Sequence, residues 1–361
     1  MVGIVGYGAW IPYMRINVDE IHRVWRNLDL QRVKVGLKLD QRAVLQPNED
    51  TITLAVGAAE RALAHATIAP SKIGAFFFGT CTNPYDSRPS VTTAAEALGL
   101  GNGIFSCDVQ FAGKSGTTAT QIGLSMIQSG MVSHALCIGS DTINRHTSPG
   151  RVAEYAASAA AVALVLGEGD VIAEITGTAS HASELSDSFR VEGERYIQDI
   201  GTGEIPGPCT AFEIGILEHS AAACKALLEP TGQKPSDFDY VIFQQPNGIT
   251  PYALGERLGF TEQQIQPGNL ATQIGDCGSA SALLGLAVVL DLAKAGQRIL
   301  LVAYGFGAGA DAFSIETTPL IERRRPVHKV ADLLANKLMA DYATASRLEF
   351  KYAQDASPLY L

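Results

Sequence analysis

The feature that most constrains the fold of this chain is a spacing that occurs twice. In the first half, a short apolar stretch is followed by Cys81, and Gly113 precedes a long helical pattern 113 − 81 = 32 positions later. In the second half, a short apolar stretch is followed by Gln244, and Asp276 precedes a helical pattern, again at 276 − 244 = 32 positions. This regularity predicts a duplicated αβ unit. We therefore expect these four residues at corresponding element ends, facing one another in one pocket.

Short apolar runs alternate with longer helical patterns along the whole chain, which predicts a largely parallel sheet with crossover helices. The predicted strands cover residues 3–7, 73–79, 104–109, 135–139, 160–166, 240–243, 299–304 and 312–316. The predicted helices cover residues 51–66, 91–98, 117–129, 217–228, 251–258 and 281–295. We predict three parts: an N-terminal half (1–170), a C-terminal half (171–318), with an approximate boundary between these two repeats, and an appendage (319–361). The appendage is predicted to be partly helical, at 330–339.

Composition favours a large globular enzyme and argues against several other classes. The chain has 361 residues, of which 47% are hydrophobic, enough for one large core or two fused halves. A net charge of −10 argues against nucleic-acid binding. Six scattered cysteines, without CxxC pairs or histidines at metal spacing, indicate a reducing compartment and no metal site. Without a signal peptide pattern or a membrane-length apolar run, we expect a cytoplasmic protein that does not contact membranes.

The segment Asp108-Val-Gln-Phe-Ala-Gly-Lys-Ser-Gly-Thr carries an unexpected glycine. A predicted strand ends here and a predicted helix begins, so the turn delivers one residue to the positive end of a helix. That position stabilises a thiolate, and a nucleophilic cysteine is typical of it. Gly113 stands there instead and has no side chain with which to attack.

Four segments together resemble the thiolase superfamily, specifically its condensing branch of 3-hydroxy-3-methylglutaryl-CoA synthase and ketoacyl synthase III. They are Gly3-Ile-Val-Gly-Tyr-Gly-Ala-Trp-Ile-Pro, Glu154-Tyr-Ala-Ala, Phe243-Gln-Gln-Pro-Asn-Gly and Gly275-Asp-Cys-Gly-Ser-Ala-Ser. The resemblance runs roughly from Gly3 to Ile315. It implies an α/β fold of the thiolase type, with five αβαβα layers made of two duplicated, thiolase-like halves.

The resemblance also shows where this chain departs from active synthases. Their catalytic glutamate falls on Cys81, their nucleophilic cysteine on Gly113 and their histidine on Gln244, and the ketoacyl synthase asparagine falls on Asp276. Base, nucleophile and oxyanion donor are thus all replaced. We therefore expect four vestigial family-site positions, no catalytic residue in this chain and no cofactor.

Among the condensing enzymes, the segments Gly79-Thr-Cys-Thr-Asn-Pro-Tyr-Asp-Ser-Arg and Val302-Ala-Tyr-Gly-Phe-Gly-Ala-Gly most resemble the synthase-like subunit of the bacterial diacetylphloroglucinol acetyltransferase. That resemblance implies a non-catalytic subunit of a multicomponent C-acetyltransferase, which moves acetyl groups between acetylphloroglucinols without coenzyme A in antibiotic biosynthesis. The implied partners are a second copy in a homodimer, a catalytic thiolase-like subunit and a small OB-fold subunit. One alternative is a free-standing condensing enzyme of the synthase type with an altered nucleophile such as Cys81. Another is a structural or channelling module for a thiolase in mevalonate-type metabolism.

Several other residues have a structural interpretation that we prefer. Cys81 is expected to be a thiol that fills the pocket, because no histidine stands at either familiar position beside it. Lys114 is expected to point to solvent or to a partner acid. Glu154 lies among small apolar residues and is predicted to be a buried, hydrogen-bonded carboxylate at the dimer side. The tail over 341–352 alternates enough to add a strand or to lie along a partner.

Overall fold

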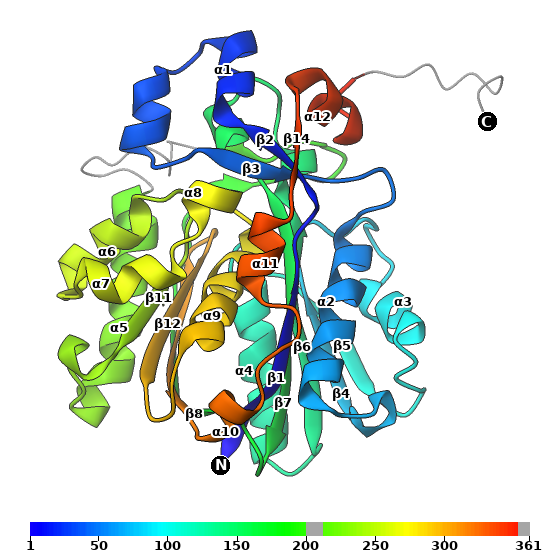
Figure 1. Cartoon of the computed structure of the whole chain (residues 1–361), viewed down its shortest axis with the longest axis vertical. Coiled ribbons are helices and arrows are strands. Elements are labelled where there is room, and N and C mark those ends of the chain that lie inside the picture. Colours follow the sequence, from blue (N-terminus) through cyan, green and yellow to red (C-terminus); the bar gives the residue numbers. More distant parts are fainter. Residues whose placement is uncertain (200–211, 353–361) are drawn as a thin grey trace.

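The structure, a computed structural model, describes residues 1–199 and 212–352, so Cys209 and the apolar end Pro358–Leu361 lie outside the described residues. A nine-stranded sheet runs through the molecule in the order β11-β12-β13-β8-β1-β7-β6-β4-β5 (Figure 1). Its strands are β1 (Val2–Trp10), β4 (Ala75–Gly79), β5 (Phe105–Val109), β6 (His134–Thr142), β7 (Ala159–Glu168), β8 (Ala173–Ala182), β11 (Tyr240–Phe243), β12 (Arg298–Gly305) and β13 (Gly309–Thr317).

The sheet contains the same four-strand pattern twice. In the first half the order is β1-β7-β6-β4, with antiparallel, antiparallel and parallel pairings. In the second half β8-β13-β12-β11 follows with the same three pairings. The prediction of a largely parallel sheet was wrong. The connections from β6 to β7 and from β12 to β13 reverse the chain, so the sheet is mixed.

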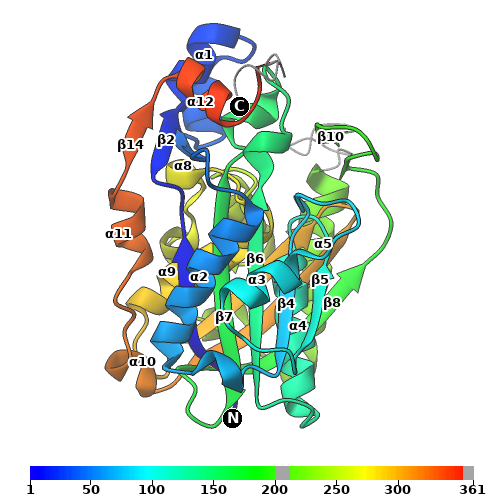
Figure 2. The same ribbon diagram turned by 90° about the vertical axis from the view of Figure 1, so that its right-hand side faces the viewer.

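The two halves of the sheet form two strand layers. The helices form three further layers that enclose them (Figures 1 and 2). Helices α4 and α9 form the central layer and share the largest buried cluster with inward-facing strand residues such as Phe77 and Phe313. The strand residues Phe76 and Phe78 face α2 and α3 on one outer side, and Val241 and Leu300 face α5 and α6 on the other. This arrangement confirms the predicted five-layered, duplicated fold. The helices are α1 (Val18–Trp25), α2 (Thr51–Ala66), α3 (Ser90–Ala97), α4 (Ser115–Gln128), α5 (Glu218–Thr231), α6 (Thr250–Leu258), α7 (Glu262–Ile265), α8 (Ala271–Ile274), α9 (Ser281–Leu292), α10 (Leu320–Arg323), α11 (Val330–Ala335) and α12 (Tyr342–Leu348).

Helix α9 explains how the centre of the molecule is filled. Its sequence, Ser281-Ala-Leu-Leu-Gly-Leu-Ala-Val-Val-Leu-Asp-Leu, is apolar on nearly every face, which is the pattern of a helix covered on all sides. Ten of its twelve residues are buried. Because α4 and α9 both begin at the same end of the sheet, their amino-terminal turns lie over the region where β4, β5 and β11 end.

The appendage differs from its prediction in two places. The predicted helix over 330–339 stops at Ala335, and residues 338–340 form β14 (Leu338–Ala340), which extends a small sheet with β2 (Met14–Asn17) and β3 (Gln41–Val44). The tail does not form a strand either. Asp341 accepts a hydrogen bond from the Thr344 N–H and thereby caps α12.

Beyond α12, the tail is part of the core of this chain. Glu349 forms an ion pair with Arg42 at 2.5 Å, Lys351 forms one with Glu154 at 2.8 Å, and all four side chains are at most 1% exposed. Removing this segment would leave buried charges without partners, which is costly. The tail is therefore held by this chain itself, and its predicted contact with a partner stays a prediction.

Two further strands complete the described structure, β9 (Ser188–Phe189) and β10 (Gln198–Asp199), which pair with each other. Within residues 1–199 and 212–352, no helix has both the length and the apolar character needed to cross a membrane.

Candidate active site

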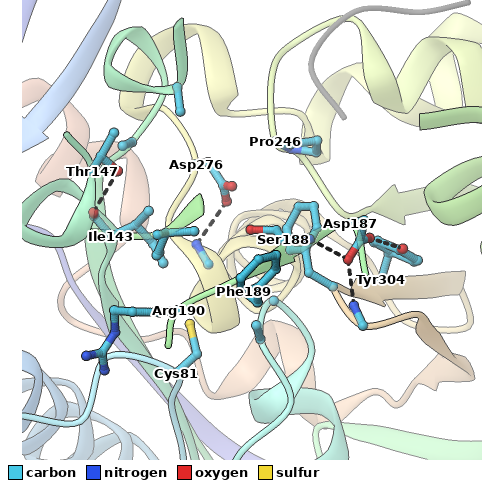
Figure 3. A pocket seen from close by; sticks show the side chains of 18 of the residues that line it. Cys81, Ile143, Thr147, Asp187, Ser188, Phe189, Arg190, Pro246, Asp276 and Tyr304 are labelled. Atoms are coloured by element: carbon cyan, nitrogen blue, oxygen red, sulfur yellow. Dashed lines mark hydrogen bonds between the residues drawn. The ribbon is translucent and has the colours of Figure 1, made fainter. Parts of the chain in front are cut away.

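A cavity of about 510 Å³ is lined by the loop over residues 110–113 that precedes α4, by Cys81 after β4, and by Gly278 of η8 (Gly278–Ala280), the turn preceding α9. Figure 3 shows side chains that line it. Three of the four residues singled out by the repeat line it: Cys81, Gly113 and Asp276. Gln244 is fully buried beside them but does not line the cavity. The structure thus brings Cys81, Gly113 and Asp276 together around one cavity, as the spacing predicts, whereas Gln244 lies outside the cavity lining.

Cys81 lies in the turn after β4, and this turn is held by a buried carboxylate. The Asp141 Oδ1 atom accepts hydrogen bonds from the Cys81 N–H at 2.9 Å and the Thr82 N–H at 3.1 Å. The Cys81 thiol donates to Asp141 Oδ2 at 3.3 Å. Burial, followed by the charge of Asp141, raises the pKa of Cys81 well above its ordinary value, while the Gly113 backbone hydrogen bond lowers it in part. The resting sulfur is therefore a thiol whose proton has an acceptor in place.

Gly113 is required by the backbone at its position. Its φ is +84°, in the left-handed region that favours glycine. A Cβ atom built there would lie 2.7 Å from the Tyr304 carbonyl oxygen and 3.5 Å from the Phe306 ring. A cysteine at this position would therefore be strained, because Gly113 packs directly against the backbone of β12.

Asp276 brings to the cavity a carboxyl group whose pKa is raised above its ordinary value. Burial, opposed by a hydrogen bond from the Gly278 N–H at 2.9 Å, raises its pKa to about 7, and the nearby charge of Asp141 adds to the increase. Its backbone is fixed on both sides, because Asp276 N donates to Ala156 O and Ser158 N donates to Asp276 O. A carboxyl group with a pKa near neutrality can act as a general base or acid at physiological pH.

Gln244 is turned away from the chemistry of the cavity. Its Nε2 donates to the Gly278 carbonyl oxygen at 3.1 Å. Its Oε1 is buried and has no hydrogen-bond partner among the described residues. With its amide donor used in this way, Gln244 is not aimed at a reacting carbonyl.

One wall of the cavity, formed by Asp187, Tyr304 and Gly307, was not predicted from the sequence. Asp187 accepts a hydrogen bond from the Tyr304 hydroxyl at 2.5 Å and from the Gly307 N–H at 2.8 Å, and all three residues line the cavity (Figure 3). Burial raises the pKa of Tyr304, so its hydroxyl stays protonated and donates. Nothing in the sequence around Asp187 signals its role.

Asp141 is the second residue that the sequence analysis missed. The only signal was its place just after the predicted strand 135–139, and strand ends are frequent positions for functional groups. Its six hydrogen bonds come from the turn after β4 and from the Ser279 N–H at 2.7 Å, so it links the two repeats beneath the cavity.

Two other predicted side chains have structural environments outside the cavity. Of the two environments predicted for Lys114, the acid partner is the one observed: Lys114 is buried and forms an ion pair with Asp311 at 3.0 Å. Glu154 is a buried, hydrogen-bonded carboxylate, as predicted, and it accepts from Tyr342 and Lys351. Its predicted place at a dimer interface stays a prediction.

Comparison with known proteins identifies the family to which this site belongs. Residues 228–317 match the family model for the 3-oxoacyl-[acyl-carrier-protein (ACP)] synthase III C-terminal region. The chain is 40% identical over 352 residues to the hydroxymethylglutaryl-CoA synthase of Methanosphaera stadtmanae, covering 97% of this chain and 99% of the relative. It is 41% identical to that of Archaeoglobus fulgidus over 343 residues, covering 95% and 97% of the two chains. The chain belongs to the hydroxymethylglutaryl-CoA synthase family.

Solved structures agree on the fold. MvaS in complex with 3-hydroxy-3-methylglutaryl coenzyme A superposes with a TM-score of 0.85 at 22% identity, covering 98% of this chain and 93% of that one. PksG, a synthase from Bacillus subtilis, superposes with a TM-score of 0.83 at 21% identity, covering 97% and 88%. Together with the family match and the relatives at 40–41% identity, this confirms the predicted resemblance to the condensing branch of the thiolase superfamily.

The comparisons overturn the finer functional prediction. The chain matches hydroxymethylglutaryl-CoA synthases over nearly its whole length, so the assignment to a non-catalytic subunit of a phloroglucinol-acylating multienzyme complex was wrong. The error arose because the three replaced positions were taken to mean lost chemistry, without knowledge of the groups that surround them. The alternative of a free-standing condensing enzyme agrees better with these relatives.

Proposed function

We propose that this protein is a condensing enzyme of acyl thioesters in which Cys81 accepts the acyl group and Asp276 acts as the general base. One observation carries the proposal: a thiol and a carboxyl group with a pKa of about 7 face the same cavity at the start of α4. Gly113 and Gln244 are assigned no catalytic role, because the first lacks a side chain and the second is bonded to Gly278.

The acyl-transfer step follows from the hydrogen bond of Cys81. As the Sγ atom attacks the thioester carbonyl carbon, its proton moves to Asp141 Oδ2, which already accepts it at 3.3 Å. The new bond joins Sγ to the acyl carbon, the bond to the sulfur of coenzyme A breaks, and that sulfur receives the proton. Because the pKa of Cys81 is raised, attack and deprotonation must be coupled, and we expect a slow acylation.

Asp276 supplies the second step. As a carboxylate it removes a proton from the α-carbon of a bound acyl thioester, and the resulting carbanion attacks the carbonyl carbon of the acyl group on Cys81. The carbon–carbon bond forms as the bond from that carbon to Sγ breaks, and the departing sulfur takes up the proton that Asp276 removed. Since the pKa of Asp276 is about 7, the carboxylate form is lost as the pH falls through 7. Activity that depends on it should therefore rise with pH up to about 8.

Coenzyme A is the proposed acyl carrier because the curated relatives are hydroxymethylglutaryl-CoA synthases. A homodimer remains our proposal for the assembly, and β5 offers a free outer edge with Phe105 55% exposed. The thiolase-like and OB-fold subunits are not carried into the proposal, because only the acetyltransferase resemblance implied them. A cytoplasmic location stays a prediction.

A turnover assay tests the proposal. Pure protein is incubated with acetyl-CoA and acetoacetyl-CoA, release of coenzyme A is followed, and the condensed product is identified by mass spectrometry. We expect release and product with the natural chain and neither with Cys81→Ala. Cys107→Ala is the matched control, because Cys107 is a half-buried thiol on β5 outside the cavity. Turnover by Cys81→Ala at the natural rate would remove Cys81 from the reaction.

A further inference from the structure

Part of the cavity lining is aromatic. Five of the lining side chains carry six-membered rings: Phe111, Phe189, Phe212, Tyr304 and Phe306. A two-carbon acetyl group would contact few of them. At about 510 Å³ the cavity lies within the range of roughly 300–1,000 Å³ found for sites that enclose drug-sized ligands.

Gly113 connects the thiol to this aromatic wall. Its backbone interacts with the Cys81 sulfur, and a Cβ atom at Gly113 would lie 3.5 Å from the Phe306 ring. Phe306 packs edge-on against Tyr304, with ring centroids 5.5 Å apart. Cys81, Phe306 and Tyr304 line the same cavity, so an acyl group attached to Cys81 shares this space with both rings.

The aromatic wall is held rigid from behind. The buried Lys114 ammonium stands 4.2 Å from the centre of the Phe111 ring, and Asp311 fixes that ammonium at 3.0 Å. Tyr304 is fixed by its hydrogen bond to Asp187. Because these polar groups are bonded to one another, the rings beside them form an apolar part of the lining that suits hydrocarbon. The same cavity is also lined by the charged Arg151, Arg190 and Asp276.

We propose that the acyl group handled at Cys81 is apolar and substantially larger than acetyl, either an aliphatic chain of about six to eight carbons or an aryl group. This inference rests on the proposed function, which places the acyl group on Cys81. It adds that Phe306 determines specificity by contacting the far end of the acyl group.

The test separates binding from chemistry by using thioethers that cannot transfer an acyl group. S-ethyl-, S-butyl-, S-hexyl-, S-octyl- and S-benzyl-coenzyme A are titrated into the natural chain and into Cys81→Ala by calorimetry. We expect affinity to rise by up to about fourfold for each added methylene until the cavity is filled. The benzyl compound distinguishes an aryl from an aliphatic preference.

Phe306→Ala should flatten the dependence on chain length, whereas Phe105→Ala, which removes an exposed ring outside the cavity, should leave it unchanged. The inference is overturned if S-ethyl-coenzyme A binds as tightly as the hexyl compound, or if none of the series binds. If affinity rises with length while no acyl thioester labels Cys81, the apolar preference of the cavity stands and the proposed reaction at Cys81 falls.

Discussion

The two copies of the repeated unit have the same strand order but offer different chemistry to the cavity. The first copy contributes the Cys81 thiol, backed by the buried Asp141, and a bare Gly113. The second contributes the Asp276 carboxyl group and turns Gln244 inward. The two copies therefore share a strand order but present different side chains to the cavity. The packing that positions four element ends is kept in both copies, while the groups placed there differ.

The largest expected effect is on the rate of condensation, and it distinguishes the role of Asp276 in the second copy from that of Cys81 in the first. Asp276→Asn keeps the shape of the side chain but cannot accept a proton, so we expect condensation to fall by about 10²- to 10⁴-fold. Acylation of Cys81 should fall much less, because Asp141 accepts the thiol proton. Measuring both rates from pH 5.5 to 8.5 checks this. Equal losses in the two rates would show that the copies do not divide the reaction in this way.

Asp276→Asn should lower the rate of condensation but raise the stability of the folded protein at pH 8. The pKa of Asp276 is raised from 3.8 to about 7 in the folded protein, so its stabilising contribution is complete below about pH 4 and is lost as the pH rises through 7. Asp276→Asn should therefore be more stable than the natural chain at pH 8, by no more than about 4 kcal/mol, and nearly equal at pH 4. Urea unfolding at the two pH values measures this. A natural chain that is the more stable at pH 8 would contradict the raised pKa.

Position 113 tests why the first copy lacks a side chain. Gly113→Ala places a Cβ 2.7 Å from the Tyr304 carbonyl oxygen at a φ of +84°, and we expect it to lower the free energy of unfolding by about 1–3 kcal/mol. Gly130→Ala is the matched control, because Gly130 also has a positive φ but no atom within 4 Å of its added Cβ. If both variants lose the same stability, contact with Tyr304 contributes nothing.

The smallest effect is expected at Gln244. Gln244→Met removes one hydrogen bond to Gly278 and one buried oxygen without a described partner, so stability should change by about 1 kcal/mol or less. Rates of acylation and condensation should stay within about twofold. A large loss of rate with unchanged stability would give Gln244 the chemical role that its orientation argues against.

Much of the scaffold could be predicted because its pattern is local. The helix over residues 51–66 and the strand over 240–243 were predicted with the bounds that the structure has, since each is a continuous apolar pattern with clear ends. Strand β8 was missed. Its residues Glu174, Thr176 and Ser180 are polar and partly exposed, so the segment lacks the apolar run of a buried strand.

The candidate site was predictable in part. The repeat placed Cys81, Gly113 and Asp276 at one cavity, because spacing determines which element ends meet. It could not show that Asp141 lies beneath Cys81, since that contact joins residues 60 positions apart. It also could not show the pKa of Asp276, which arises from burial by residues of both repeats. The functional prediction failed because it rested on residue identity alone.

The most direct test of the account is the site of acylation in the natural chain. The protein is incubated with acetyl-, hexanoyl- or benzoyl-CoA at pH 8, quenched in acid and digested, and the acylated peptide is sequenced by mass spectrometry. We predict one acyl group, on Cys81, that is absent from Cys81→Ala and retained in Cys107→Ala. A chain that stays unmodified with all three thioesters, or that is labelled at Cys107 instead, would contradict the account.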